Sequence, residues 1–434
     1  MYIYQRLLKY RLLILIISII VTLGTGILFY GLSLSILHFA ALPNYIVFLL
    51  LFRDKIRRRT YSKYVVYFIL LIALIAAYMA LLAHMIPDIR IRWSELPVAA
   101  WFLSSIYIMI WLIDCIIKRI LSIPFIFKPA LKTIRPLLIA KTSCRILCVM
   151  AIAIPYLIAV FMVNWIKFAD NTNPAIQFGL DFKQVSFEAT DAVKLKGWFI
   201  PSVRDKSNST IIISPGRGTT KAGFLSYARI FSENGQNVLL FDHRGQGASG
   251  GHTRSFGQFE TNDVKGAVEY LKEFQPDSSK YIFALGISHG APAVISAAAD
   301  DSRIQAVILD SAFISSGSFI NRITYWLPGY INTYLNITTR IFASGLTGCN
   351  FFHEDNRYTD IAKISPRPVL IFHGTNDKIS DYKQAKKLYE SAKDPKKICI
   401  IPAAGHAQIL LYTRERYIQE ITETIIEGSL VRWR

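Results

Sequence analysis

The sequence has few cysteines, and their spacing is uninformative for disulfide or metal chemistry. The 434-residue chain contains five cysteines, at positions 115, 144, 148, 349 and 399, and no C-x-x-C pair. An odd number of cysteines argues against a disulfide scaffold. The lack of a C-x-x-C pair argues against a structural zinc site. Cys144 and Cys148 are interpreted as small apolar residues of a helix, and no metal or cofactor is expected.

Charged residues are also scarce, and acidic residues are nearly missing from the first part of the chain. Only 18% of residues are charged, whereas 52% are hydrophobic. This composition excludes a disordered or fibrous protein, and it is more apolar than that of an ordinary soluble protein. Residues 1–170 contain 19 Lys and Arg but 5 Asp and Glu, whereas residues 171–434 contain 30 and 25. The basic excess therefore belongs to the apolar part, where it indicates membrane topology and not a nucleic-acid partner.

Long stretches without charge predict membrane-spanning helices. No charged residue occurs over the 41 positions 12–52, about twice the roughly 20 residues that one helix needs to cross a bilayer. We expect an all-α transmembrane domain over residues 1–170. Its five helices are predicted at 12–29, 34–52, 65–86, 96–117 and 146–166. The first run is too long for a cleavable signal peptide, and no repeat or half-helix indicates a transporter, so an anchor is favoured.

Basic residues in the short loops predict the orientation of these helices. Lys and Arg are concentrated in the N-terminal tail and in the loops 53–63 and 118–145, whereas the loop 87–95 is balanced. The positive-inside rule then places the three basic segments in the cytoplasm. Five spans would leave residues 171–434 on the extracytoplasmic side of the cytoplasmic membrane, and four spans would reverse that side.

After residue 170 the pattern changes to short apolar runs that alternate with helical segments. The runs expected as buried strands are 210–214, 238–242, 281–286, 306–310, 369–373 and 398–401. Such alternation predicts an α/β domain over residues 171–434, with a mostly parallel sheet and helices on both faces. The segments 185–187 and 195–200 are expected to form an antiparallel pair at one edge.

A G-x-S-x-G motif at 286–290 lies between a predicted strand and an Ala-rich helical segment. A strand-to-helix turn tight enough to expose the hydroxyl of Ser288 leaves no room for side chains at Gly286 and Gly290. The N-terminus of the following helix also favours a developing negative charge. The motif therefore predicts that Ser288 is a nucleophile.

The sequence offers an acid and a base for this nucleophile, each directly after a predicted strand and in the chain order Ser, Asp, His that α/β-hydrolases use. Asp377 follows the strand 369–373, and His406 follows the strand 398–401. A neutral imidazole must take the proton of Ser288, and a carboxylate must orient that imidazole. Asp310 also ends a strand and is the second candidate for the acid. His289 is adjacent to Ser288 and is expected to point away from it.

An oxyanion hole needs two backbone N–H groups. One is expected from His289, which directly follows the nucleophile. The other is expected from Arg217, in the Pro-Gly-Arg-Gly loop after the strand 210–214, because glycines on both sides allow a substrate carbonyl to approach.

Together these segments give residues 182–427 a resemblance to bacterial α/β-hydrolases of the serine aminopeptidase S33 and lysophospholipase-like group. The matching segments are 191–198, Asp-His-Arg-Gly-Gln-Gly-Ala-Ser at 242–249, 286–290, His-Gly-Thr-Asn-Asp at 373–377 and Gly-His at 405–406. The resemblance implies the α/β-hydrolase fold and a Ser-Asp-His triad. Pro215 and His289 depart from the usual residues of the group, but both positions keep their backbone donors. The transmembrane part resembles no recognised family.

The long insert at about 311–361 is rich in aromatic residues, and in this fold such an insert forms a cap over the active site. We therefore expect a membrane-anchored serine hydrolase that cleaves an ester, thioester or amide of an apolar or lipid-like substrate in contact with the bilayer. A serine aminopeptidase is an alternative and would need an acidic cluster near Ser288. A non-catalytic membrane binding or assembly protein is the second alternative.

Overall fold

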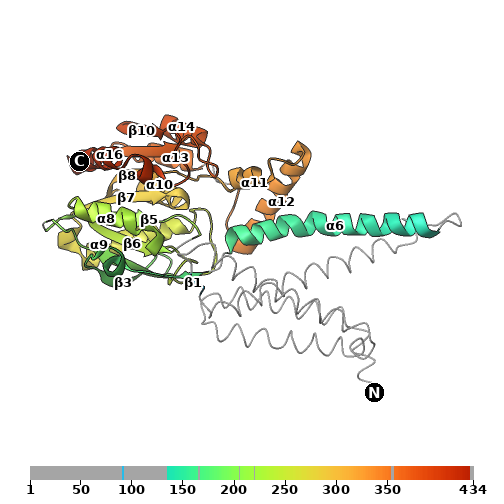
Figure 1. Ribbon diagram of the computed structural model, residues 1–434, viewed down its shortest axis with the longest axis horizontal. Helices are drawn as coiled ribbons and strands as arrows, with labels where there is room; N and C mark the ends of the chain where they lie inside the picture. Colours follow the sequence, from blue (N-terminus) through green and yellow to red (C-terminus); the bar gives the residue numbers. More distant parts are fainter. Residues whose placement is uncertain are drawn as a thin grey trace, which may run out of the picture. The chain divides into compact units, whose positions relative to one another are not determined.

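The computed structural model describes residues 90–91, 134–164, 167–204, 206–218, 220–352 and 356–430 (Figure 1). Of the five expected membrane spans, the first four lie outside the described residues, and the fifth, 146–166, overlaps helix α6 (Ile134–Val163). Within the described part of the chain, no helix is both long enough and apolar enough to cross a membrane.

The centre of the described structure is an eight-stranded sheet with the order β10-β9-β8-β7-β5-β6-β4-β3. Its strands are β3 (Lys183–Glu188), β4 (Lys194–Ile200), β5 (Ser209–Ser214), β6 (Asn237–Asp242), β7 (Tyr281–Ile287), β8 (Ile304–Asp310), β9 (Val369–Gly374) and β10 (Lys396–Ile401). All neighbours are parallel except β3 with β4 and β4 with β6, so the antiparallel pair lies at one edge as the sequence predicts. A separate pair, β1 (Arg90–Ile91) and β2 (Phe168–Ala169), is antiparallel.

Helices cover both faces of this sheet (Figure 1). One core lies between the sheet and α9, α10, α13 and α14, and a second core lies between the sheet and α8, α15 and α16. The bounds are α7 (Pro174–Phe178), α8 (Leu225–Glu233), α9 (Glu260–Phe274), α10 (Ala291–Asp300), α13 (Asn356–Lys363), α14 (Tyr382–Ser391), α15 (Ile409–Tyr412) and α16 (Arg414–Leu430). This arrangement confirms the predicted α/β-hydrolase fold.

The central strands are largely apolar because both of their faces are covered, and polar residues stand mainly at their ends. Every residue of β5, β6 and β9 is buried. Parallel strands between two helical layers lack a solvent face, so their sequences are continuous apolar runs and not alternating ones. The carboxyl ends of these strands meet at one edge of the sheet, and the loops that follow them can bring distant residues together.

The insert after β8 contributes two helices, α11 (Ser316–Thr324) and α12 (Gly329–Thr347), which pack against each other. α12 also packs along α6. A third core joins Ala159, Met162 and Val163 of α6 to aromatic residues of the hydrolase such as Phe256 and Phe351. The last turn of α6 is therefore part of the hydrolase core, although the sequence assigns it to the preceding domain.

Candidate active site

Ser288 lies directly after β7, at the start of the one-turn 3₁₀ segment Ser288–Gly290 that leads into α10. Its φ of 52° is in the left-handed region, where a non-glycine residue is strained. A Cβ on Gly290 would lie 2.1 Å from the carbonyl oxygen of Ser214, and one on Gly286 would lie 2.6 Å from Cα of Ala291. The two glycines are therefore required for this sharp turn.

The structure brings together the three residues expected to act as nucleophile, base and acid. Ser288 Oγ lies 2.6 Å from Nε2 of His406. Nδ1 of the same imidazole lies 2.7 Å from Oδ2 of Asp377. Ser288 comes from the end of β7, Asp377 from the loop after β9 and His406 from the loop after β10, so three parallel strands position the set.

Asp377 is held as a carboxylate by several donors. Its Oδ1 accepts hydrogen bonds of 2.8 Å from the backbone N–H groups of Ile379 and Ser380. Nε2 of His373, the last residue of the predicted strand 369–373, lies 3.3 Å from Oδ2 of Asp377. Burial alone would raise the pKa of Asp377, but the bonds from His373, His406 and Ser380 keep it well below its usual range.

Asp310, the second candidate for the acid, occupies a different place. It is fully buried and accepts hydrogen bonds from the hydroxyls of Tyr227 at 3.2 Å, Tyr417 at 3.1 Å and Ser311 at 2.9 Å. Burial raises the pKa of Asp310 despite these bonds. Ser311 Oγ in turn accepts the N–H of Ala407, so Asp310 stabilises the loop of His406 without bonding to its ring.

The two expected oxyanion donors belong to loops that meet at Ser288. Arg217 follows Gly216, where an added Cβ would lie 3.4 Å from Cβ of Ser288. His289 follows the nucleophile, and its ring is buried edge-on against Phe256 with 4.5 Å between ring centroids. Burial lowers the pKa of His289 to about 3, so the ring is neutral and turned away from the catalytic set.

The side chain of Arg217 connects the loop after β5 to α6. Its Nη2 donates to the carbonyl oxygen of Phe161, near the end of that helix. The guanidinium also lies over the rings of Phe256, at 5.8 Å, and Phe319, at 6.0 Å. Nearby, the N–H of Arg254 donates to the carbonyl oxygen of Val163 at 2.8 Å. The end of α6 is therefore bonded to the loop that carries a predicted oxyanion donor.

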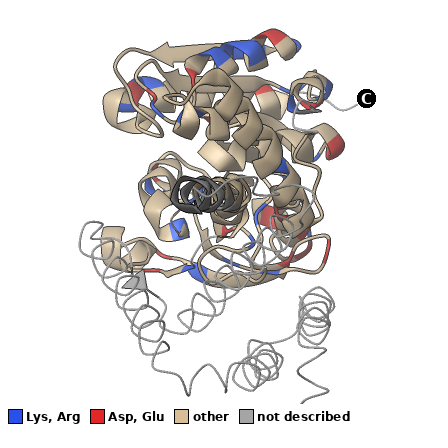
Figure 2. Cartoon of the chain, turned by 90° about the vertical axis from the view of Figure 1, so that its right-hand side faces the viewer, with Lys and Arg blue, Asp and Glu red and all other residues tan. Residues whose placement is uncertain are grey.

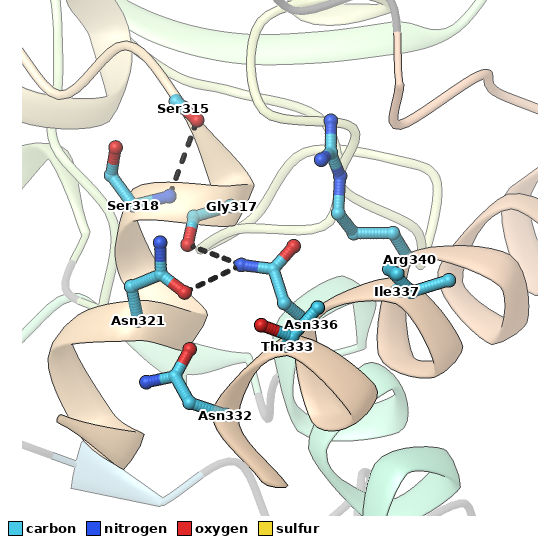
Figure 3. Close-up of a pocket in the computed structure, with 9 residues that line it drawn as sticks. All are labelled: Ser315, Gly317, Ser318, Asn321, Asn332, Thr333, Asn336, Ile337 and Arg340. Carbon is cyan, nitrogen blue, oxygen red and sulfur yellow. Dashed lines mark hydrogen bonds between the residues drawn. The ribbon is translucent and has the colours of Figure 1, made fainter. Parts of the chain in front are cut away.

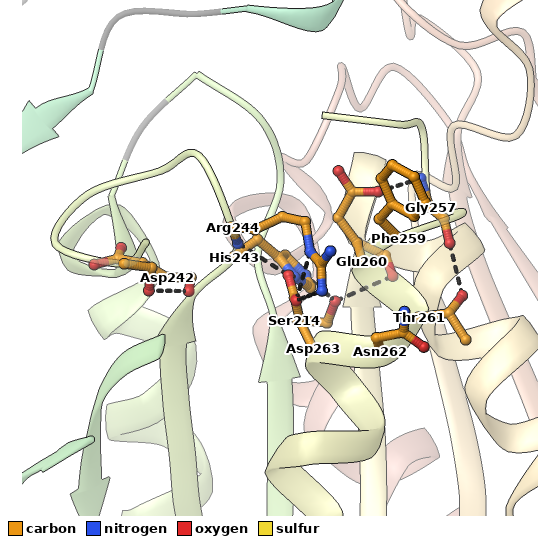
Figure 4. A network of polar contacts seen from close by, with 12 residues as sticks. Ser214, Asp242, His243, Arg244, Gly257, Phe259, Glu260, Thr261, Asn262 and Asp263 are labelled. Atoms are coloured by element: carbon orange, nitrogen blue, oxygen red, sulfur yellow. Dashed lines mark hydrogen bonds and ion pairs between the residues drawn. The ribbon is translucent and has the colours of Figure 1, made fainter. Parts of the chain in front are cut away.

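A second serine–histidine–aspartate chain lies below this loop (Figure 4). Ser214 Oγ lies 2.7 Å from Nε2 of His243, and Nδ1 of that ring lies 3.0 Å from Oδ2 of Asp263. All three side chains are buried, and Ser214 Oγ also donates to the carbonyl oxygen of Gly290 at 3.1 Å. These contacts hold the loop after β5 against the turn of Ser288. The sequence alone does not predict these contacts, because the three side chains come from separate elements.

Glu260, at the start of α9, is a buried carboxylate in the same region (Figure 4). It accepts hydrogen bonds from the N–H and Oγ of Ser255 and from the N–H of Gly257, at 2.6 to 2.9 Å. Burial alone would raise the pKa of Glu260. The charge that His289 gains when acid protonates its ring, together with the hydrogen bonds from Ser255, lowers this pKa to about 2.

The depressed pKa of Glu260 predicts a specific acid sensitivity. Since its folded pKa of about 2 lies below the ordinary 4.5, its contribution to stability is complete above pH 4.5 and is lost as the pH falls toward 2. We expect Glu260→Gln to lower the thermal unfolding temperature at pH 7 and to reduce its further fall in acid. Thermal unfolding of the full chain in detergent from pH 7 to pH 3 measures both effects. The exposed Glu427→Gln is the control, and equal pH profiles for Glu260→Gln and wild type would contradict the assignment.

Comparisons with known proteins agree with this fold. Residues 205–357 match the family described as serine aminopeptidase, S33. The protein YfhR of Escherichia coli K12 is 30% identical over 229 residues, which cover 52% of this chain and 73% of YfhR. YqkD of Bacillus subtilis strain 168 is 31% identical over 234 residues, covering 53% and 74%. The structure of the esterase Pf2001 of Pyrococcus furiosus has a TM-score of 0.51 and 24% identity over 61% of this chain and 97% of its own.

The fold and the turn that exposes Ser288 define a serine hydrolase of the α/β-hydrolase class. More specifically, the chain belongs to the hydrolase family of YfhR and YqkD, and its central segment is similar to the S33 peptidases.

Proposed function

We propose that this chain is a membrane-anchored serine hydrolase that cleaves an ester, thioester or amide bond of an apolar, lipid-like acyl substrate. The observation that carries the proposal is the hydrogen-bonded chain from Ser288 through His406 to Asp377. Three residues separated by 29 to 118 positions in sequence have the geometry that nucleophilic acyl transfer requires.

In the proposed reaction, Ser288 Oγ attacks the substrate carbonyl while His406 Nε2 takes its proton. Asp377 accepts the Nδ1–H of His406, fixes its tautomer and stabilises the imidazolium that forms. His406 then gives the proton to the leaving alcohol, thiol or amine, and an acyl-enzyme remains on Ser288. Water, activated by the same imidazole, attacks this ester and releases the acid.

The backbone N–H groups of Arg217 and His289 are proposed to bind the oxyanion. The close approach of Gly216 to Ser288 supports this role for the loop after β5, because a carbonyl held at Oγ would face that loop. Donors fixed in a buried loop stabilise developing charge without reorganisation, and each is worth about 10²-fold to 10³-fold in rate. The hydrogen bonds of Ser214 with Gly290 and His243 hold the loop after β5, which contains Arg217, next to the turn that contains His289.

The surroundings of Ser288 favour an apolar acyl group over the N-terminus of a peptide. The N–H of Phe313 donates to the carbonyl oxygen of Ser288 at 3.1 Å, and Phe313 belongs to the aromatic core that also contains Phe256 and Phe351. An aminopeptidase would need a carboxylate for the substrate ammonium. Among the described residues near Ser288, Glu260 and Asp310 are both buried and engaged by internal donors. These observations support the esterase-like alternative.

The membrane anchor in this proposal is supported by the sequence that precedes α6. Residues 1–133 contain the four apolar stretches expected to span the bilayer, and the N-terminal tail and the loop 53–63 are basic whereas the loop 87–95 is balanced. With 146–166 as a fifth span, the positive-inside rule would place the hydrolase on the extracytoplasmic side of the cytoplasmic membrane. With only the first four spans, and with α6 packed against the hydrolase instead, the same rule would place it on the cytoplasmic side.

Covalent labelling of isolated membranes with a fluorophosphonate tests the proposed chemistry. The wild-type chain is expected to be labelled, and Ser288→Ala is expected to lose the label at equal abundance. Ser316→Ala, a buried serine of the cap, is the matched control and should be labelled like wild type. Labelled protein would then be assayed on acyl esters of increasing chain length and on aminoacyl amides. Equal labelling of Ser288→Ala would reject the nucleophile, and faster cleavage of aminoacyl amides would favour the peptidase alternative.

A further inference from the structure

The cap helix α12 exposes an apolar stripe. Tyr330, Tyr334, Ile337 and Ile341 follow one another at helical spacing, and their exposed fractions are 77%, 41%, 46% and 55%. The opposite face is buried through Leu335, Thr339 and Ala343. A surface helix normally buries its apolar face against the protein core. α12 has a second apolar face that is exposed to solvent, and such a surface indicates a binding site for a partner.

The turn that precedes α12 continues this surface. Tyr325 and Trp326 are 76% and 71% exposed, and Ile323 at the end of α11 is 42% exposed. The indole Nε1 of Trp326 donates to the carbonyl oxygen of Ile323 at 3.1 Å, which satisfies its polar group within the chain. Tyrosine and tryptophan with one apolar and one polar end are the residues enriched at membrane interfaces.

The charge of the cap matches a phospholipid surface. From Ser311 to His353 the chain contains Arg322 and Arg340 but no Asp or Glu. The acidic residues of the insert, Glu354, Asp355 and Asp360, follow the two cap helices in the sequence. Figure 2 shows acidic residues in red on other parts of the described chain. A segment with aromatic residues, two cations and no anions is attracted to an anionic bilayer, whereas an average soluble surface mixes both signs.

The position of α12 next to α6 supports the same partner. The hydroxyl of Tyr334 donates to the carbonyl oxygen of Ala151 at 2.8 Å, and Tyr156 meets Phe342 edge-on. α6 itself exposes Leu147 and Phe161, at 69% and 56%. Since α6 directly follows the first four predicted membrane-spanning segments in the chain, the helix against which the cap packs connects the hydrolase to those segments.

A polar groove lies between α11 and α12, beside the apolar stripe (Figure 3). Its volume is about 410 Å³, and its lining includes Asn321, Asn332, Asn336, Ser318, Thr333 and Arg340. Asn336 donates to Asn321 Oδ1 at 2.8 Å and to the carbonyl oxygen of Gly317 at 3.0 Å. Amide, hydroxyl and guanidinium groups without a carboxylate suit the phosphate and glycerol oxygens of lipid headgroups.

We propose that the cap binds the bilayer surface through the apolar stripe of α12 and the Tyr325–Trp326 turn, with the polar groove in the headgroup layer. This inference rests on the proposed function and deepens it: the substrate is an acyl ester taken from the membrane leaflet and not from solution. The bilayer is favoured over a protein partner because the cap helices α11 and α12 contain no acidic residue and because α12 packs along α6, which follows the first four predicted membrane segments.

Photo-crosslinking of the full chain tests the contact independently of catalysis. Benzoylphenylalanine would replace Tyr330, or Phe274 as the control. Phe274 is 60% exposed at the end of α9, outside the cap. Both proteins would be reconstituted in vesicles of phosphatidylcholine and phosphatidylglycerol and irradiated. Lipid adducts at position 330 but not at 274 are expected. Adducts between position 330 and the N-terminal part of the chain, crosslinked dimers, or the lack of a lipid adduct at 330 would each overturn the proposal.

Kinetics give a second readout. Tyr330→Asp places an anion on the stripe and is expected to lower cleavage of a long-chain acyl ester in these vesicles by about fivefold or more. Cleavage of a soluble short-chain ester should be unchanged, and Phe274→Asp should affect neither substrate. Equal loss on both substrates would contradict the docking role. If the proposed hydrolase function fails, no ester is cleaved by any variant, while the crosslinking result still reports on the cap.

Discussion

His406→Ala is expected to lower kcat for ester hydrolysis by roughly 10⁶-fold, because the nucleophile then has no base. The imidazole lies 2.6 Å from Ser288 Oγ in the structure, and the other described histidines contact different residues. A hydroxyl without a base is a weak nucleophile at neutral pH. Initial rates with a soluble short-chain ester and the extent of fluorophosphonate labelling measure this loss.

His252→Ala is the matched control for that substitution. His252 is partly buried, and its position after the loop of Asp242 is remote from β9 and β10 in the sheet order. It should retain activity within a few-fold of wild type. Comparable activity of His406→Ala and wild type, with both proteins folded, would remove His406 from the mechanism.

Asp377→Asn is expected to lower kcat by about 10⁴-fold, whereas Asp310→Asn should lower it by less than tenfold. Asp377 Oδ2 is 2.7 Å from Nδ1 of His406, so an amide there would present the wrong hydrogen-bonding group and select the wrong tautomer. Asp310 accepts hydrogen bonds from Tyr227, Tyr417 and Ser311 and does not bond to the ring of His406. Its main effect should therefore be on stability.

Steady-state kinetics and thermal unfolding of both variants separate the two roles. Asp377→Asn should lose kcat with little change in KM, and it should also lower the unfolding temperature, because the donors around Asp377 stabilise its carboxylate in the folded state. Asp310→Asn should lower the unfolding temperature while kcat stays within tenfold of wild type. If Asp310→Asn instead loses activity by 10⁴-fold while Asp377→Asn retains it, the second candidate for the acid would be the correct one.

The fold could be predicted largely from local patterns. β5, β6 and β9 each begin within one residue of the predicted strand, because a strand covered on both faces has an almost continuous apolar run at its centre. The positions of Ser288, Asp377 and His406 were also predictable, since each follows a strand in a loop and parallel strands end at one edge. Their catalytic roles stay a prediction that the labelling experiment tests.

Contacts between distant polar residues could not be predicted in the same way. His373 reads as the last residue of an apolar strand, and only the folded loop brings it to Asp377. The chain of Ser214, His243 and Asp263 joins three separate elements, β5, the loop after β6 and α9. The contacts of Ala159, Met162 and Val163 with the hydrolase cannot be predicted from the sequence, because an apolar helix that packs in a protein core has the same composition as one that faces lipid.

The contacts of α6 make the hydrolase less modular than its sequence boundary implies. A catalytic fragment that begins at residue 171 would lose Ala159, Met162 and Val163, and Phe256 and Phe351 would then face water. The same fragment would leave the guanidinium of Arg217 without the carbonyl of Phe161. A gene fusion that exchanged the membrane anchor would therefore need to break the chain before α6 and not after it. The functional boundary of the hydrolase therefore lies before α6, and a transferable catalytic unit would include this helix.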